Sequence, residues 1–166
     1  MESLNIIRTF CYALENQMKF VSKDLADEDL RWRSSEHSSP APGWIVGHVL
    51  VSHEQIVNQL FLGNDPILPE EYYSVFGMGT DGDFPDSIKL KNLFKNFAKV
   101  NSRIIKDLMQ KPDTWLEEYP NDEYFPPHWK NKNHMKVFVL HFNHVFTHSG
   151  QILEIKRMVG KGAWGF

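Results

Sequence analysis

The spacing of apolar residues is the feature that most constrains the fold of this chain. Near the start of the sequence these residues recur in alternating steps of three and four, which places them on one face of an α-helix. The members of this first stripe are Leu4, Ile7, Cys11, Leu14, Met18 and Val21. The pattern predicts a helix that begins after Ser3 and ends near Lys23 and Asp24.

Three further segments carry helical signals. The second helix is expected to follow Pro42 and Gly43 and to span residues 44–62, with apolar residues nearly all round it. The third is expected to begin at Asp86 or Ser87 and to stop before the Lys111-Pro112 pair, because proline interrupts a helix. The last is expected to begin near residue 133 and to run to residue 159, with a glycine at the position that favours a helix end.

Two long connections separate these helices. Residues 64–85 and 112–132 are rich in proline and aromatic residues, and both are much longer than the turns of a simple up-and-down bundle. No strand-like alternation is long enough to build a sheet. We therefore predict an all-α fold, a four-helix bundle with two long crossover connections, formed by residues 1–166 as a single domain.

Composition excludes several classes of function. The formal net charge is −3 and basic residues are scattered, so no nucleic-acid partner is expected. No apolar stretch approaches the ~20 residues that span a bilayer, and the first residues do not resemble a signal peptide. The single cysteine, Cys11, lies within the first apolar stripe and is interpreted as an inert core thiol. We expect a cytoplasmic protein without a membrane partner.

Histidines provide the candidate site. The chain has eight, and three of them, His141, His144 and His148, lie on the last predicted helix. A pair four residues apart arises by chance in a chain with this many histidines, so position must decide. All three share the face that continues to Ile152, and an unpaired imidazole on a buried face is costly. Several histidines facing the core together favour a metal site.

A third ligand is expected from the second helix, which offers His48 and His53. These two residues lie about 140° apart round an ideal helix, so they cannot serve one site. The face of His48 is unusually polar for a buried helix and suits groups that support a metal site, whereas His53 is interpreted as a packed or surface histidine. The polar residues on the His48 face are Ser52, Gln55 and Gln59. The histidines expected at the surface are His37, His128 and His134.

Two segments resemble a known family. Residues 143–152, Asn-His-Val-Phe-Thr-His-Ser-Gly-Gln-Ile, are similar to the Asn-His-x-x-x-His-x-Gly-Gln-Ile motif of the DinB-like superfamily. Residues 43–48, Gly-Trp-Ile-Val-Gly-His, resemble the start of that family's second helix. The resemblance implies a four-helix bundle that binds one divalent metal ion (zinc, nickel or iron) through His48, His144 and His148. Ser149 stands where many members have arginine or histidine.

The remaining motif residues have structural interpretations. Gly47 and Gly150 are expected to let neighbouring elements approach closely. Gln151 is expected either to orient a ligand imidazole or to be solvated. Trp44 is interpreted as a core anchor. Glu54 is the nearest candidate for a general base, but on an ideal helix it points away from His48.

Three neutral imidazoles without a fourth protein ligand describe an open site, which is typical of catalysis. The family resemblance implies a thiol-dependent S-transferase in which the metal activates a low-molecular-weight thiol for attack on a small electrophile. The alternatives are a metal-dependent hydrolase and a non-catalytic metal-binding bundle. A homodimer is also expected, because twelve Phe and five Trp favour an exposed apolar face and because DinB-like proteins often pair.

Overall fold

The computed structural model describes residues 2–34, 39–121, 123 and 125–162. Within these residues the chain is helical and contains no β-strand, so the prediction of an all-α chain is confirmed. The described α-helices are α1 (Glu2–Ser22), α2 (Pro42–His53), α3 (Glu70–Phe76), α4 (Leu90–Leu108) and α5 (His134–Met158).

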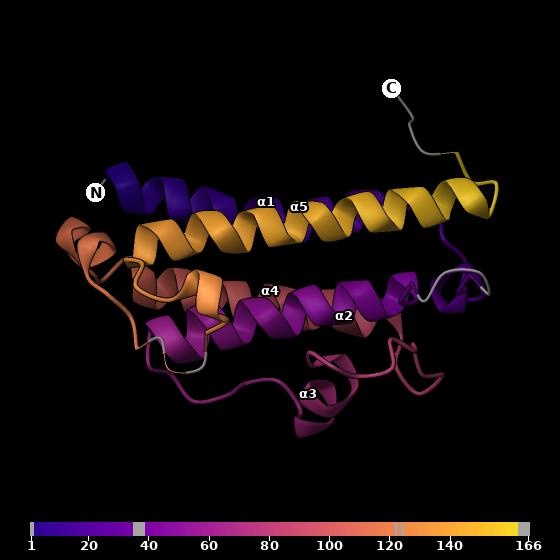
Figure 1. Ribbon diagram of the computed structural model, residues 1–166, viewed down its shortest axis with the longest axis horizontal. Coiled ribbons are helices and arrows are strands. Elements are labelled where there is room, and N and C mark those ends of the chain that lie inside the picture. Colours follow the sequence, from indigo (N-terminus) through magenta and orange to yellow (C-terminus); the bar gives the residue numbers. More distant parts are fainter. Residues whose placement is uncertain (1, 35–38, 122, 124, 163–166) are drawn as a thin grey trace.

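Four of these helices are long and lie side by side (Figure 1). α1 packs against both α5 and α4, and α2 packs against α5 and α4 on the other side. The short helix α3 lies beneath α2 in this view and packs against it. α2 therefore contacts helices on several sides, which explains why its apolar residues occur nearly all round it.

The first apolar stripe is buried as predicted. Its six members are each at most 2 % exposed, and they form one continuous core with residues from the other helices. Cys11 is one of them, and burial raises the pKa of its thiol to about 12. The thiol is therefore protonated at neutral pH, in agreement with its interpretation as part of the core.

The second predicted helix has two parts. α2 is an ordinary α-helix, but it continues without a break into η2 (Glu54–Phe61), which is a π-helix. In a π-helix the hydrogen bonds join residues five apart, so side chains five apart lie on one face. The amide of Gln59 accordingly donates to the carboxylate of Glu54. Gly63 follows with a left-handed φ of 69°, a conformation in which glycine commonly ends a helix.

One predicted helix boundary was wrong. α4 begins at Leu90 and not at Asp86 or Ser87, because Lys89 is extended, with φ −110° and ψ 141°, and caps the helix instead. Residues 64–85 connect two long helices as predicted, and they also contain the short helix α3. The predicted start of α5 is confirmed, since the Asn133 side chain accepts a hydrogen bond from the backbone N–H of Lys136.

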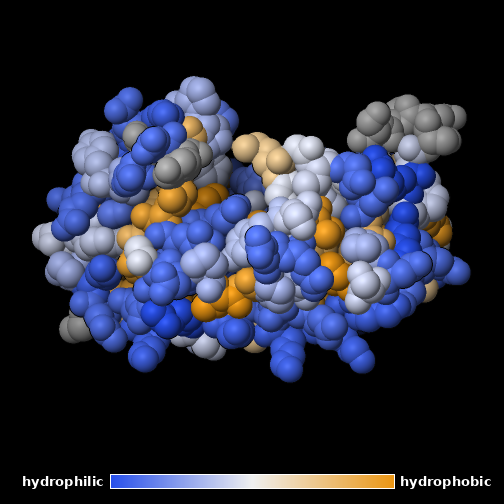
Figure 2. All heavy atoms as spheres, turned by 90° about the horizontal axis from the view of Figure 1, so that it is seen from below, coloured by the Kyte–Doolittle hydropathy of each residue, from blue (hydrophilic) through white to orange (hydrophobic). Residues whose placement is uncertain are grey.

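The other connections contain short 3₁₀ turns, η1 (Asp29–Arg31), η3 (Asp113–Glu117) and η4 (Pro127–Trp129). None of the helices among the described residues is both long enough and apolar enough to cross a membrane. Seen from below, the molecule is mostly hydrophilic, and hydrophobic side chains show through in separate patches (Figure 2). This face therefore has no broad apolar surface of the kind that marks a large interface.

Candidate metal centre

The structure brings together the three histidines predicted as ligands. His48 comes from the middle of α2, and His144 and His148 lie one turn apart on α5. One ring nitrogen from each lies within 4.8 Å of the other two, and the three residues could hold a metal ion. Within the described part of the chain they form the one such cluster of histidine, cysteine and carboxylate side chains. The packing of α2 against α5 creates it.

The hydrogen bonds of the histidine rings indicate which ring nitrogens have a lone pair available for a metal ion. His48 Nδ1 lies 2.8 Å from the carbonyl oxygen of Phe76, and His148 Nδ1 lies 2.7 Å from Oε1 of Gln151. Because both partners are acceptors, each Nδ1 must carry the proton, which leaves a lone pair on each Nε2. His148 Nε2 lies 2.8 Å from His144 Nε2, so the free nitrogens converge. Both predictions for Gln151 hold, since its side chain is exposed and also accepts a hydrogen bond from the His148 ring.

Burial keeps these imidazoles neutral. It lowers the pKa of His48 and of His148, and burial together with the neighbouring rings of His148 and His48 lowers the pKa of His144 to about 3. A metal binds the neutral form of imidazole, so none of the three has to lose a proton at neutral pH before it binds. The three imidazoles are therefore in the protonation state that metal binding requires.

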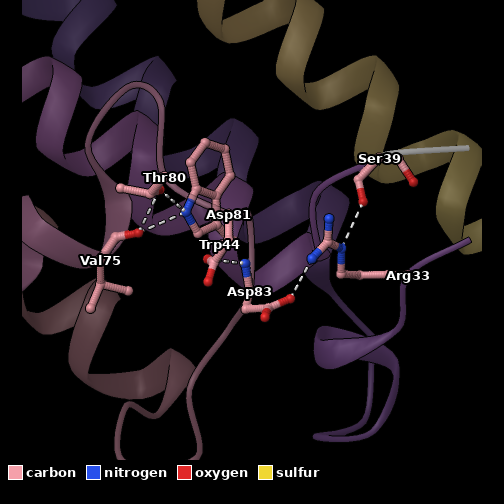
Figure 3. A network of polar contacts seen from close by, with 7 residues as sticks. All are labelled: Arg33, Ser39, Trp44, Val75, Thr80, Asp81 and Asp83. Atoms are coloured by element: carbon pink, nitrogen blue, oxygen red, sulfur yellow. Dashed lines mark hydrogen bonds and ion pairs between the residues drawn. The ribbon is translucent and has the colours of Figure 1, made fainter.

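The Trp44 side chain packs against one face of the His48 ring. Its indole ring is 7 % exposed and stacks on the His48 ring, with centroids 4.7 Å apart and planes 8° apart. Figure 3 shows that the indole N–H donates to the carbonyl of Val75, at 2.8 Å, and to the hydroxyl of Thr80, at 3.0 Å. Trp44 is thus a core anchor as predicted, and it also ties His48 to the segment that supplies the Phe76 carbonyl.

Residues 75–83 are also held at their C-terminal end, by contacts of Arg33 and Ala41. Arg33 donates to the carboxylate of Asp83 and to the carbonyl of Ser39 (Figure 3). The backbone N–H of Ala41 donates to the carbonyl of Gly82, just before α2 begins. The segment 75–83 is therefore fixed to the start of α2 at both ends, which holds the Phe76 carbonyl in place for His48.

His48 and His144 line a large pocket with a volume of about 760 Å³. One wall is the polar face of α2 and η2 that was predicted to accompany His48, formed by Ser52, Gln55 and Gln59. The two long connections supply aromatic and apolar residues, as expected, including Met78, Phe125 and Trp129. Among the described residues that line the pocket, none is Asp, Glu, Lys or Arg. The described lining is thus mainly aromatic and apolar, with one polar wall.

Comparison with known proteins adds no relative. No protein-family model and no curated protein matches the chain. The resemblance to the DinB-like superfamily therefore depends on the two quoted motifs alone and stays a prediction.

The other five histidines have different surroundings. His53 and His141 are each 1 % exposed and lie against each other in the core, so His53 is packed, and His141 is close to the site without belonging to the cluster of three. His128 is exposed as predicted and lines the pocket. The prediction for His134 was wrong: it is 3 % exposed, stacks on Trp115 and donates from Nδ1 to that residue's carbonyl oxygen. His37 lies outside the described residues.

Glu54 is not placed to act as a general base. It is fully buried, is not among the described residues that line the pocket, and accepts hydrogen bonds from the side chains of Asn58, Gln59 and Tyr73 and from the backbone N–H of Ile67. These bonds fasten the start of the 64–85 connection to η2. The carboxylate is therefore a structural anchor whose oxygens are already used.

The two motif glycines differ in their surroundings. A Cβ atom on Gly47 would lie 2.4 Å from Cδ1 of Phe76, so the expected close approach is confirmed there. A Cβ atom on Gly150 would meet nothing within 4 Å, so the same expectation for Gly150 was wrong. Ser149 is buried and donates to the carbonyl of Val145, which keeps its hydroxyl away from the site.

Sequence reasoning missed two functional features of the site. The Phe76 carbonyl orients His48, but a backbone group leaves no signal in the residue type. Asn101 is 2 % exposed and accepts a hydrogen bond from His53, and its position within the apolar stripe of α4 could have indicated a buried polar contact.

Proposed function

We propose that the protein is a divalent-metal-dependent enzyme and that its reaction is the transfer of a small thiol to an electrophile. The observation that carries the proposal is the convergence of His48, His144 and His148 beside a large pocket, which His48 and His144 line. Three histidine ligands leave an open coordination position, the arrangement of catalytic sites more often than of structural ones. A divalent ion held there would lower the pKa of a thiol at the open position, so that thiolate is available at neutral pH.

The composition of the pocket supports thiol transfer over hydrolysis. A thiolate is itself the nucleophile, so the step needs no carboxylate base: its sulfur forms a bond to an electrophilic carbon while the leaving group departs with its electron pair. Hydrolysis commonly uses a general base, and the nearest carboxylate candidate, Glu54, is fully engaged elsewhere. The apolar walls, which include Phe125 and Trp129, suit an uncharged organic electrophile.

The arrangement of the helices and the family fit the same proposal. We propose that α1, α2, α4 and α5 form a four-helix bundle of the DinB-like type, in which residues 64–85 and 112–132 are the crossover connections. In support, both connections reach the pocket, through Met78 from the first and Phe125 from the second. We further propose zinc, nickel or iron as the native metal and the cytoplasm as the compartment, where low-molecular-weight thiols remain reduced.

Cobalt substitution tests the reaction. Cobalt-loaded protein should develop a sulfur-to-metal charge-transfer band when cysteine, glutathione, bacillithiol or mycothiol is added, and conjugation of a chlorodinitrobenzene or a bimane should require both metal and thiol. A His144→Ala variant should show neither response. A His134→Ala variant removes a buried histidine of the same helix that does not face the pocket, and should keep both.

The alternatives give different results. A cobalt spectrum that no thiol changes, with ester or amide hydrolysis that needs metal alone, would refute thiol transfer and favour a hydrolase. Stoichiometric metal without either activity would favour a non-catalytic metal-binding protein.

A further inference from the structure

A second group of buried polar residues crosses the molecule beside the metal centre. Each of the four long helices contributes one member: Glu15 from α1, Asn101 from α4, His53 from α2 and His141 from α5. All four are at most 8 % exposed. Buried polar groups cost stability unless they are paired, so a line of four that joins all four long helices requires an explanation.

The hydrogen bonds along this line all have the same donor-to-acceptor direction, from His141 towards Glu15. Glu15 carboxylate oxygens accept from Lys19 and, at 2.9 Å, from the Asn101 side-chain N–H. The amide oxygen of Asn101 therefore faces His53 Nε2, at 3.0 Å, and must accept from it. His53 Nδ1 is then left with a lone pair, and it lies 3.1 Å from His141 Nε2, which must donate. The carboxylate at one end thus fixes the tautomers of both histidines.

The same groups exclude the reverse direction, in which each residue would donate towards His141. If His53 donated to His141, its Nε2 would need a donor, and the Asn101 amide would have to turn its N–H₂ group towards His53. The amide oxygen would then face the Glu15 carboxylate, placing two acceptors 2.9 Å apart. Burial also lowers the pKa of His53 to about 4 and that of His141 well below its usual range, so both rings are neutral at pH 7.

At the end of this line that lies beside the metal centre, His141 has a lone pair that is not used within the line. With its proton on Nε2, His141 presents an acceptor at Nδ1, and this buried atom has no hydrogen-bond partner among the described residues. The same is true of Nδ1 of His144, one turn further along α5. The two rings are neighbours, with centroids 6.1 Å apart and planes inclined by 34°. A metal on His144 Nε2 leaves the proton on Nδ1, which then needs an acceptor.

We propose that His141 is that acceptor, through one bridging water, so that Glu15, Asn101, His53 and His141 form an outer chain that positions His144 as a metal ligand. The inference rests on the proposed metal centre. His48 and His148 already have partners for Nδ1, in the Phe76 carbonyl and in Gln151, and the chain supplies the third. A ligand imidazole whose second nitrogen donates towards a carboxylate is oriented and is a stronger donor.

Zinc affinity and ring tautomers test this inference together. Asn101→Leu removes both bonds of Asn101 at similar volume and should weaken zinc binding by about 10- to 100-fold in a chelator competition. Glu15→Gln keeps the shape and should weaken it in the same direction by less. His134→Gln alters another buried histidine of α5, bonded to the Trp115 carbonyl, and should leave zinc affinity unchanged.

Long-range ¹H–¹⁵N spectra give a readout that a merely structural role would not move. In zinc-loaded wild-type protein, His53 and His141 should carry their protons on Nε2, and His144 should carry its proton on Nδ1. In Asn101→Leu, His53 should lose its single tautomer. If Asn101→Leu does not fold, Glu15→Gln provides the same comparison.

The outcomes separate the two proposals. Wild-type protein that binds no divalent ion would refute the metal centre, and this inference with it. Wild-type protein that binds zinc, with Glu15→Gln and Asn101→Leu binding it equally tightly, would overturn the chain alone. A proton on Nδ1 of His141 would also overturn it, because the acceptor for His144 would be missing.

Discussion

The close contact between Gly47 and Phe76 predicts how much stability is lost when one methyl group is added at residue 47. The Cβ atom of a Gly47→Ala variant would lie 2.4–2.6 Å from three atoms of the Phe76 ring, with Cδ1 nearest at 2.4 Å, far inside van der Waals distance. The Phe76 ring is fully buried and is held by the rings of Tyr72 and Phe84, so it cannot turn aside freely. Overpacking of this kind costs about 3 kcal/mol, at the upper end of the usual range.

A matched variant isolates the steric part of this cost. Replacing glycine by alanine within a helix gains about 1 kcal/mol, so Gly47→Ala should lose about 2 kcal/mol in net stability. Gly150→Ala makes the same change on α5, where a Cβ atom would meet nothing within 4 Å, and should gain about 1 kcal/mol. The two variants should therefore differ by about 3 kcal/mol, with opposite signs relative to the wild type.

Urea denaturation followed by circular dichroism measures both values. For a chain of this size the loss at Gly47 corresponds to a midpoint about 4–8 °C lower in thermal unfolding. Phe76→Leu should reduce the cost of Gly47→Ala, because the ring that causes the clash is smaller. A Gly47→Ala protein as stable as the wild type would refute this account of how α3 packs on α2.

Three further predictions concern pH, the Glu54 anchor and association. His53 has a pKa of about 4 in the folded protein against about 6.5 when unfolded, so the unfolded chain binds more protons at pH 5. The free energy of unfolding should therefore fall by about 2 kcal/mol from pH 7 to pH 5, which urea titrations at the two pH values can measure. Tyr73→Phe removes a 2.6 Å hydrogen bond to Glu54 and should cost about 1.5–3 kcal/mol while metal content, measured by elemental analysis, stays unchanged. Phe146 on α5 is 52 % exposed, and if this face pairs two copies, Phe146→Glu should convert a dimer into a monomer in sedimentation; a wild-type monomer at micromolar concentration would refute the predicted dimer.

Apolar spacing predicted the long helices because it reports which face is buried. It located α1 and α5 closely, since the stripe of α1 and the Asn133 cap are local signals. It did not reveal η2, because hydrogen bonding between residues five apart leaves no trace in residue type. α3 was missed because seven residues are too few for a periodic pattern.

The candidate site was predictable where it depended on position along one helix. His144 and His148 share a face of α5 by spacing alone, and the polar face beside His48 distinguished it from His53. The burial of His134 could not be predicted, because the 3₁₀ turn η3 brings Trp115 onto its ring from a connection nineteen residues away in sequence. Contacts such as that of His53 with Asn101 depend on how the helices are rotated against one another, which no single-helix pattern contains.

Metal content tests the central claim most directly. Protein purified without a histidine tag should contain one divalent ion per chain by elemental analysis, and His48→Ala, His144→Ala and His148→Ala should each lose most of it while His134→Ala retains it. The fold should survive all four changes, because the apolar core does not depend on the metal. Wild-type protein without metal, or a folded His48→Ala variant with a full equivalent of it, would contradict the assignment.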